Sequence, residues 1–246
     1  MPDESALTER IALVTGASGG IGSAVCRRLA RETAKIAVVY GRNAEPAEAL
    51  AAEIVAEGGT AQAFASEMAD PSGPDRLIDE VEATLGPVDI LIANHGHARS
   101  ARYQDIDAAA FDQTLAVNLR APFLLARRAL PGMVERGFGR VLFISSVAAF
   151  RGGVVGPDYA SSKAGLHGLA HFLASRVGAH GVTVNVLAPG FIQTAMLPGD
   201  PQQLAKATPL GRVGRPEEVA DLALAMLRNG YINSQVFSID GGMYPR

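Results

Sequence analysis

A tyrosine and a lysine stand one helical turn apart, at Tyr159 and Lys163, near the start of a predicted helix. Side chains at positions i and i+4 lie on one face of a helix, so we expect the ammonium group to come up beside the phenol. A phenol has a reference pKa of about 10, which is too high for easy proton transfer near neutral pH. A neighbouring ammonium group favours the phenolate and lowers that pKa. The pair is therefore a candidate general acid and base.

Two other polar side chains could take part in the same chemistry. Ser146 follows a predicted strand, and a hydroxyl group at the carboxyl end of a strand can hydrogen-bond a substrate carbonyl. Asn118 lies among the apolar positions of another predicted helix. A buried amide needs hydrogen-bond partners, so Asn118 could hold a water molecule or a backbone carbonyl, or it could be a satisfied core residue.

A glycine-rich segment directly after the first predicted strand could bind a dinucleotide. Glycines let the backbone approach a pyrophosphate closely, and the N-terminus of the following helix offers free N–H groups to the phosphates. The residues expected to contact the cofactor are Gly16, Ser18, Gly19, Gly20, Ile21 and Gly22. The segment also fits the G-x-S-x-G pattern of serine hydrolases around Ser18. That motif normally follows several strands, whereas only about fifteen residues precede Ser18 here.

The end of the second predicted strand bears on which dinucleotide binds. An Asp or Glu there would hydrogen-bond the ribose 2′-hydroxyl of NAD, but residues 39–43 read V-Y-G-R-N and contain no acid. A guanidinium group suits the geometry of a 2′-phosphate, so Arg42 favours NADP(H), with NAD(H) as the alternative. Arg42 could also be a solvated loop charge.

Short apolar runs alternate with longer helical patterns along the chain. The predicted strands are residues 11–15, 36–40, 90–94, 141–145, 182–187 and 236–240, with a weaker candidate at 61–65. The predicted helices are residues 21–31, 46–57, 74–85, 108–136, 157–179 and 216–227. Continuous apolar strands that alternate with helices indicate a parallel sheet covered on both faces. We predict an α/β fold, a Rossmann-type doubly wound parallel sheet of about seven strands whose ligands bind beyond the carboxyl ends of the strands.

Composition excludes several classes of protein. The 246 residues are 48% apolar with a net charge of −3 and scattered basic residues, so we expect no nucleic-acid partner, and we assign no metal site. The single cysteine, Cys26, is expected in the core and fits a reducing compartment. The N-terminus is not a secretory signal, and no apolar run reaches the roughly 18 residues of a membrane span. We expect a cytoplasmic protein with a flexible tail over residues 1–9 and one catalytic domain over 10–246.

Together, these motifs resemble the short-chain dehydrogenase/reductase family, in the subgroup similar to 3-oxoacyl-(acyl-carrier-protein) reductases. The resemblance runs from about residue 10 to residue 243. The motifs that carry it are the T-G-x-x-x-G-I-G loop, Asn118, Ser146, the Y-x-x-x-K pair, Pro189-Gly190 with Thr194, and Asp240-Gly241-Gly242.

The resemblance implies an enzyme that transfers hydride between C4 of a nicotinamide and a carbonyl carbon. It implies that Tyr159 protonates the alkoxide, that Ser146 polarises the carbonyl, and that Lys163 bonds the nicotinamide ribose. Asn118 would position a water molecule that connects Lys163 to solvent. The resemblance also implies a homotetramer. Further cofactor contacts are implied at Glu67, Met68, Asn94, Gly96, Pro189, Gly190, Ile192 and Thr194.

Three departures from the family pattern stand out. His95 occupies the middle of the usual N-A-G segment, where it could enter the substrate cleft, make a new polar contact or simply be accommodated. Gly19 replaces a basic residue, which weakens the case for NADP(H). Near the positions where carrier-protein reductases present arginines, this chain has Arg136, one residue out of register, and His180, so docking of an acyl carrier protein is left open.

A small lid around residues 195–215, with Met196, Leu197 and Leu210, indicates a fairly open and apolar substrate site. We therefore predict an NADP(H)-dependent ketoreductase that acts on a small-molecule ketone such as a 3-oxoacyl thioester or a polyketide-like compound. An NAD(P)-dependent secondary alcohol or sugar dehydrogenase is the alternative. A noncatalytic dinucleotide-binding protein is a more remote one, because both Tyr159 and Lys163 are present.

Overall fold

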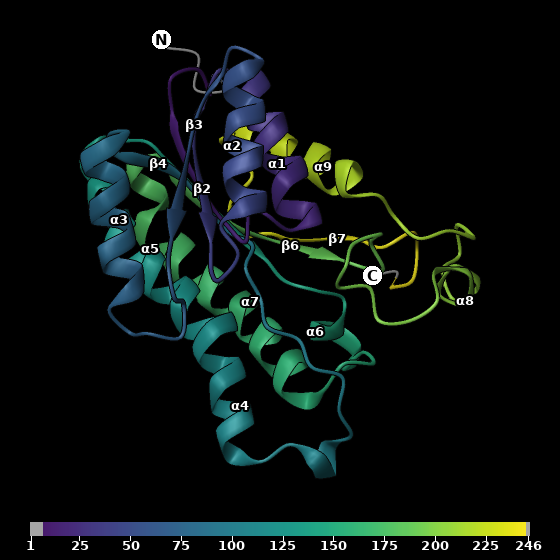
Figure 1. Ribbon diagram of the computed structural model, residues 1–246. Helices are drawn as coiled ribbons and strands as arrows, with labels where there is room; N and C mark the ends of the chain where they lie inside the picture. The colour runs from purple at the N-terminus through teal and green to yellow at the C-terminus, as the bar shows by residue number, and fades with distance from the viewer. Residues whose placement is uncertain (1–6, 245–246) are drawn as a thin grey trace.

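A computed structural model of the chain describes residues 7–244, in which one parallel sheet forms the centre of the molecule (Figure 1). Its seven strands follow the order β3-β2-β1-β4-β5-β6-β7. They are β1 (Ile11–Thr15), β2 (Lys35–Tyr40), β3 (Thr60–Ala65), β4 (Val88–Ala93), β5 (Gly139–Ile144), β6 (Val182–Pro189) and β7 (Val236–Ile239). The predicted α/β fold is confirmed, and the weaker strand candidate at 61–65 is β3.

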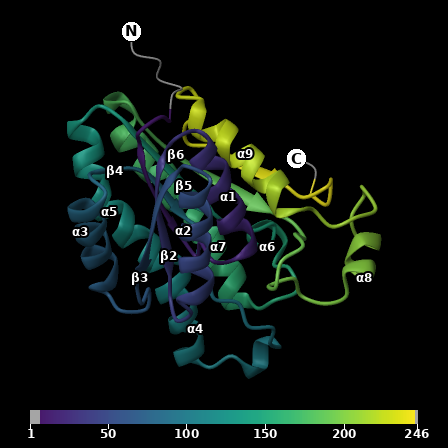
Figure 2. The same cartoon turned by 45° about the horizontal axis from the view of Figure 1, so that its top comes forward.

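Helices cover both faces of the sheet, as Figures 1 and 2 show. One face carries α1 (Gly20–Arg31), α2 (Glu45–Ala56) and α9 (Pro216–Arg228). The other face carries α3 (Gly73–Thr84), α5 (Ala121–Glu135) and α7 (Pro157–Val177). Shorter pieces are α4 (Ala108–Leu115), α6 (Ala148–Arg151), α8 (Pro201–Lys206), η1 (Tyr103–Asp105) and η3 (Gly178–His180). Each face has its own apolar core, and every residue of the central strands β1, β4 and β5 is buried because helices pack on both sides.

The strand order reverses next to β1, whose two neighbours are β2 and β4. The connections that leave β1 and β4 therefore pass to opposite faces of the sheet, and a crevice opens between them at the carboxyl edge. The glycine loop follows β1 and the segment Asn94–His95–Gly96 follows β4. The topology thus brings two of the predicted cofactor-binding segments to one place.

The predicted single helix over residues 108–136 is wrong in one respect. A π-helical segment, η2 (Ala116–Arg120), separates α4 from α5. Pro122 lies near the start of α5 and has no N–H to donate to the carbonyl of Asn118, one turn earlier. The helix widens there by one residue per turn, which is a common feature of functional sites.

Two residues of the predicted tail, Leu7 and Glu9, contact the rest of the chain. The Leu7 side chain is buried in the core beneath α1, and the backbone N–H of Glu9 donates to Thr33 at 3.1 Å. An apolar side chain in an otherwise polar segment was the signal for this packing. Residues 1–6 of the predicted tail lie outside the described residues. Cys26 is buried, as predicted, and burial raises the pKa of its thiol to about 12.

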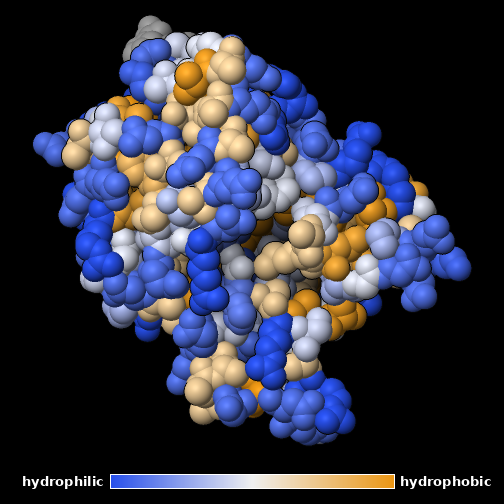
Figure 3. All heavy atoms as spheres, in the orientation of Figure 1, coloured by the Kyte–Doolittle hydropathy of each residue, from blue (hydrophilic) through white to orange (hydrophobic). Residues whose placement is uncertain are grey.

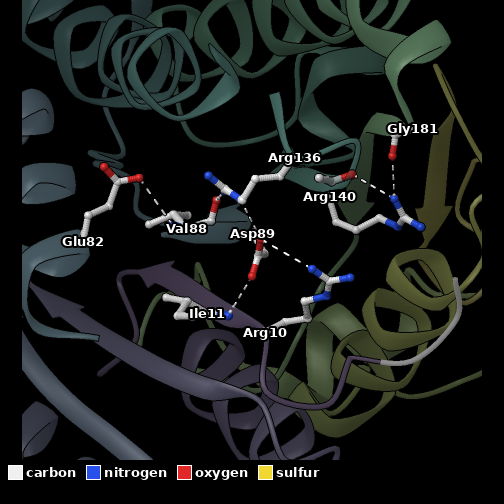
Figure 4. Close-up of polar contacts among 9 residues, drawn as sticks. Arg10, Ile11, Glu82, Val88, Asp89, Arg136, Arg140 and Gly181 are labelled. Atoms are coloured by element: carbon white, nitrogen blue, oxygen red, sulfur yellow. Dashed lines mark hydrogen bonds and ion pairs between the residues drawn. The ribbon is translucent and has the colours of Figure 1, made fainter. Parts of the chain in front are cut away.

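A cluster of polar side chains lies at the amino edge of the sheet, opposite the carboxyl edge where the crevice opens (Figure 4). The Asp89 carboxylate is nearly buried and lies between two guanidinium groups, 3.3 Å from Arg136 and 3.7 Å from Arg10. It also accepts the backbone N–H of Ile11 at 3.4 Å, and Arg136 donates to the carbonyl of Val88 at 2.7 Å. The cluster ties β1 and β4 to the end of α5. It occupies Arg136 with partners inside the same chain.

Among residues 7–244, none of the helices is both long and apolar enough to cross a membrane.

Candidate functional site

A cavity of about 650 Å³ lies at the carboxyl edge of the sheet, where the segments after β1, β4, β5 and β6 meet. In Figure 3 the surface is hollowed near the centre of this face, and apolar residues gather beside the hollow on the side that carries α8. Most of the residues predicted to bind the cofactor or to take part in catalysis line this cavity. The predicted residues on its wall are Gly16, Gly19, Gly20, Ile21, Asn94, Gly96, Ser146, Tyr159, Lys163, Pro189, Gly190, Ile192 and Thr194.

The glycine loop needs its glycines for close packing. Gly16 has a φ of +61°, and a Cβ atom there would lie 2.9 Å from the Cα atom of His95. A Cβ atom at Gly22 would lie 2.3 Å from the carbonyl oxygen of Gly16. The Asn94 amide donates to the carbonyls of both Thr15 and Gly16 at 3.0 Å, so the end of β4 holds the loop in place.

The N-terminus of α1 faces this cavity without a side-chain cap. Ser23 donates the first helical hydrogen bond, to Gly19, so the three preceding N–H groups have no helical acceptor. Gly19, Gly20 and Ile21 line the cavity, and a Cβ atom at Gly20 would lie 2.7 Å from Thr194. Free N–H groups and the positive end of the helix dipole suit a pyrophosphate. The loop therefore fits the phosphates of a dinucleotide.

Three predicted catalytic side chains meet on the wall of the same cavity. Tyr159 lies in the first turn of α7 and hydrogen-bonds the Ser146 side chain, which follows β5. Lys163 Nζ donates to the carbonyl of Ile144 at 2.8 Å and lies 5.9 Å from the centre of the Tyr159 ring. The structure thus brings a phenol, a hydroxyl and an ammonium group together from two elements.

Burial determines the acidity of this group. Burial raises the pKa of the Tyr159 phenol above its ordinary value, and the hydrogen bond with Ser146 offsets part of that rise. Burial also lowers the pKa of the Lys163 ammonium to about 8. The predicted net lowering of the tyrosine pKa is therefore wrong for this structure. Sequence reasoning counted the nearby positive charge but not the loss of water around the phenol.

Asn118 lies behind the cavity wall and is completely buried. Its Oδ1 accepts the backbone N–H of His97 at 2.7 Å, and its Nδ2 donates to the His97 carbonyl at 2.8 Å and to Ser162 Oγ at 3.1 Å. The amide therefore clamps the segment after β4 against α7. Of the options weighed from sequence, the structure shows Asn118 holding a backbone carbonyl.

His95 makes new polar contacts, one of the outcomes considered from the sequence. Its Nε2 lies 2.9 Å from the carbonyl of Val117, which can only accept, so Nε2 carries the proton. Its Nδ1 then accepts the hydroxyl of Thr15 at 2.7 Å. Burial, followed by the charge of Lys163, lowers the pKa of His95 to about 4. A neutral imidazole thus joins the end of β1 to the π-helical segment.

The remaining predicted cofactor residues lie beside the cavity rather than on its wall. Residues 41–43 and 66–68 follow neighbouring strands, and Ser66 donates to the carbonyl of Tyr40 at 2.9 Å. Arg42 and Glu67 are exposed there, whereas Met68 packs into the core. Two residues of the glycine loop also do not line the cavity, namely Ser18, which is exposed, and Gly22, which is buried.

The segments after β6 close the cavity from the side of α8. Gly190 donates its N–H to the carbonyl of Ile239 in β7 at 2.9 Å, which fixes the turn that follows β6. In the predicted lid, Met196 and Leu197 line the cavity, whereas Leu210 does not. Sequence reasoning missed other residues of the wall, among them Arg151 and Met243. Neither belongs to a motif, and only the fold brings them to the site.

The comparison with protein families agrees with the motifs. The family described as short chain dehydrogenase matches residues 10–205. The chain belongs to the short-chain dehydrogenase/reductase family. It is 34% identical over 244 residues to an acetoacetyl-CoA reductase of Cupriavidus necator, covering 97% of this chain and 99% of the relative. It is 35% identical over 243 residues to a 3-oxoacyl-(acyl-carrier-protein) reductase of Synechocystis sp., covering 97% of this chain and 98% of that relative.

Solved structures of the family are also close to this short-chain dehydrogenase/reductase. One is a blue fluorescent protein from a metagenomic library in complex with NADPH, with a TM-score of 0.90 and 34% identity over 98% of this chain and 100% of that one. The chain is thus an NAD(P)-dependent oxidoreductase with a Rossmann fold.

The neutral state of His95 should make folding stability depend on pH. The native pKa of about 4 lies below the reference value of about 6.5, so the unfolded chain binds more protons between these values. Stability therefore falls as the pH drops through this window, by up to about 3 kcal/mol. We would measure the free energy of unfolding by urea denaturation at several pH values from 7.5 to 4.5. This free energy should fall less steeply with decreasing pH in His95→Ala than in wild type. His180→Ala, at an exposed residue, should keep the wild-type pH dependence of stability. The same pH dependence in all three proteins would contradict the assignment of a neutral, buried His95.

Lys163 should reduce stability while serving activity. Its pKa of about 8 means that the unfolded chain binds more protons between that value and about 10.4, so the buried charge costs stability at neutral pH. We expect Lys163→Met to abolish reductase activity without lowering the melting temperature at pH 7. Lys206→Met, at an exposed residue, is the control and should change neither the activity nor the melting temperature. A melting temperature several degrees lower in Lys163→Met would show that the ammonium stabilises the fold.

Proposed function

We propose that this enzyme reduces a ketone to a secondary alcohol with NADP(H), and that Tyr159 is the general acid. The observation that carries the proposal is the meeting of Tyr159, Ser146 and Lys163 on the wall of the cavity that the glycine loop also lines. When bound, the nicotinamide cofactor supplies the hydride.

Each of the three side chains has a task that follows from its position. The Ser146 hydroxyl donates to the substrate carbonyl oxygen and holds it beside the Tyr159 phenol. The phenol gives its Oη proton to that oxygen as negative charge develops on it. The Lys163 ammonium, held by the Ile144 carbonyl, favours the resulting phenolate. A phenol with the ordinary pKa of about 10 is already protonated at neutral pH, which is the state that a general acid needs, and burial raises the pKa of Tyr159 further.

Asn118 serves as a positioning residue in this proposal. It contacts neither the cavity nor the Tyr159 phenol but fixes the backbone of His97 and the hydroxyl of Ser162. Gly96 lies between this clamp and the cavity, and a Cβ atom there would be 3.4 Å from Lys163 Nζ. The water molecule that connects Lys163 to solvent is carried over from the family resemblance.

The residues of the glycine loop would hold the pyrophosphate, and Pro189, Gly190, Ile192 and Thr194 would face the nicotinamide. Three observations support NADP(H) over NAD(H). Residues 39–43 carry no acid, Arg42 is exposed and forms no ion pair within residues 7–244, and the metagenomic relative is a complex with NADPH. Arg42 and Glu67 follow neighbouring strands at the edge where the adenosine half would lie.

The similarity to an acetoacetyl-CoA reductase supports a 3-oxoacyl thioester or a related ketone as the substrate. We do not extend the proposal to an acyl carrier protein, because Arg136 is engaged by Asp89 and Val88. Homotetrameric assembly is part of the proposal and rests on the family resemblance. A cytoplasmic location is also proposed, and it rests on the single cysteine, which fits a reducing compartment.

Removing the phenol hydroxyl tests the role of Tyr159. We expect Tyr159→Phe to lower kcat for ketone reduction by about 10²–10⁴-fold, which is the usual contribution of a general acid. Its affinity for NADPH, measured by fluorescence titration, should stay within about twofold of wild type. Tyr231→Phe, at a residue that is 99% exposed, should leave both values unchanged. Substantial turnover by Tyr159→Phe would rule out the assigned role.

Removing the Arg42 guanidinium tests the choice of dinucleotide. A charge-assisted hydrogen bond contributes about 1.5–3 kcal/mol, so we expect Arg42→Ala to raise the KM for NADPH about 10- to 100-fold. The KM for NADH should change much less. Steady-state kinetics with both cofactors measures the difference, with the exposed Arg31→Ala as the control. Equal changes for both cofactors would refute recognition of a phosphate by Arg42.

A further inference from the structure

Apart from the catalytic side chains, the residues that line the cavity are mostly apolar. Val147, Val154, Met196 and Leu197 are among these residues. Of all the side chains in the described chain that line the cavity, only Lys163 and Arg151 carry a charge, and none is a carboxylate. Both charged side chains on the described cavity wall are therefore positive.

The two cations have different surroundings. Lys163 is buried beside Tyr159 and donates to a backbone carbonyl. Arg151 is the last residue of α6 and is exposed at the cavity wall. Within residues 7–244, it donates only through Nη1, to the carbonyl of Met243 at 3.1 Å. A carbonyl does not neutralise a guanidinium charge, and Arg151 forms no ion pair within residues 7–244. The half-buried Arg128, in contrast, lies against both Asp79 and Glu82.

We propose that Arg151 binds an anionic group of the substrate, a carboxylate or a phosphate, and thereby selects ketones that carry such a group. This inference rests on the proposed reductase function and names its substrate class. A guanidinium group has five N–H donors arranged for bidentate binding of carboxylate and phosphate oxygens, and among the described residues only Nη1 of Arg151 has an acceptor. The absence of carboxylates from the described cavity wall leaves its positive potential uncompensated.

The position of Arg151 also sets the spacing between the two substrate groups. Ser146, which holds the carbonyl in the proposed mechanism, is joined to Arg151 by a short helical connection that ends with α6 (Ala148–Arg151). At a rise of about 1.5 Å per residue, the two backbones are about 8 Å apart. A carboxylate directly next to the carbonyl would stay near Ser146. We expect a spacer of several atoms, so 5-oxo and 6-oxo acids should bind better than 2-oxo acids.

Matched pairs of substrates test the proposal. We would measure kcat/KM for 2-oxo to 6-oxo carboxylic acids and for their methyl esters, which keep the shape but lack the charge. Wild type should prefer the longer acids to their esters by at least about tenfold, mainly through KM. Arg151→Ala should abolish this preference, and Arg151→Lys should retain part of it because a charge remains without the planar fork. Arg31→Ala, exposed and outside the cavity, should keep the wild-type preference.

A second pair distinguishes the source of the anion. If phosphates are bound, 3-oxobutyryl-CoA should lose its advantage over the phosphate-free N-acetylcysteamine thioester in Arg151→Ala. If the substrate's own carboxylate is bound, that advantage should be unchanged while the acid-to-ester preference is lost. Both results support an anion site at Arg151. The anion site would be overturned if Arg151→Ala had the same kcat/KM ratio as wild type for both substrate pairs, the acids against their esters and the CoA thioester against the N-acetylcysteamine thioester.

Binding measured without turnover separates this inference from the proposed function. Calorimetric titration of the longer oxo acids and their esters into wild type and Arg151→Ala, each with NADP⁺ present, reports on the anion site directly. If wild type reduces no ketone but binds the acids at least about tenfold more tightly than Arg151→Ala does, the proposed function fails and the anion site remains. If ketones are reduced but the acids bind both proteins equally, only the anion site fails.

Discussion

The hydrogen bond between Lys163 and the Ile144 carbonyl is the contact on which the site depends most. It holds an ammonium group, with its side chain almost completely buried, at the carboxyl end of β5, one turn along α7 from Tyr159. A buried charge is unfavourable unless hydrogen bonds replace its water, and the lowered pKa of Lys163 records that cost. The arrangement is therefore maintained against a loss of stability, as expected of a group retained for its chemistry.

The surrounding polar contacts keep this group in place. Asn94 holds the glycine loop to the end of β4, and Asn118 holds the next segment to α7. His95 joins these two clamps through Thr15 and the π-helical segment. Almost every buried donor and acceptor in this region is paired within the chain, so the network is rigid before any ligand binds. A site organised in this way can stabilise charge that develops during reaction without rearranging.

Much of the fold and the site could be predicted because their signals are local. Continuous apolar strands between helical patterns indicated the parallel sheet, and the spacing of Tyr159 and Lys163 indicated a shared helix face. The π-helical segment escaped prediction because periodicity continues through it, although Pro122 was a signal. Met68 packs in the core rather than on the cavity wall, since sequence position alone does not tell which way a side chain points. The pKa of Tyr159 and the place of Arg151 both depend on residues distant in the sequence, which only the folded chain brings together.

Transfer of deuterium from NADPH labelled at C4 tests most directly whether Tyr159, Ser146 and Lys163 form the site of carbonyl reduction. The enzyme would be incubated with the labelled cofactor and a ketone, and the product would be analysed by mass spectrometry and NMR. We expect one deuterium on the carbinol carbon in wild type and no labelled alcohol above background in the triple variant Ser146→Ala, Tyr159→Phe, Lys163→Met. Labelled alcohol formed equally by both proteins, or none formed by wild type from any ketone, would contradict the central claim.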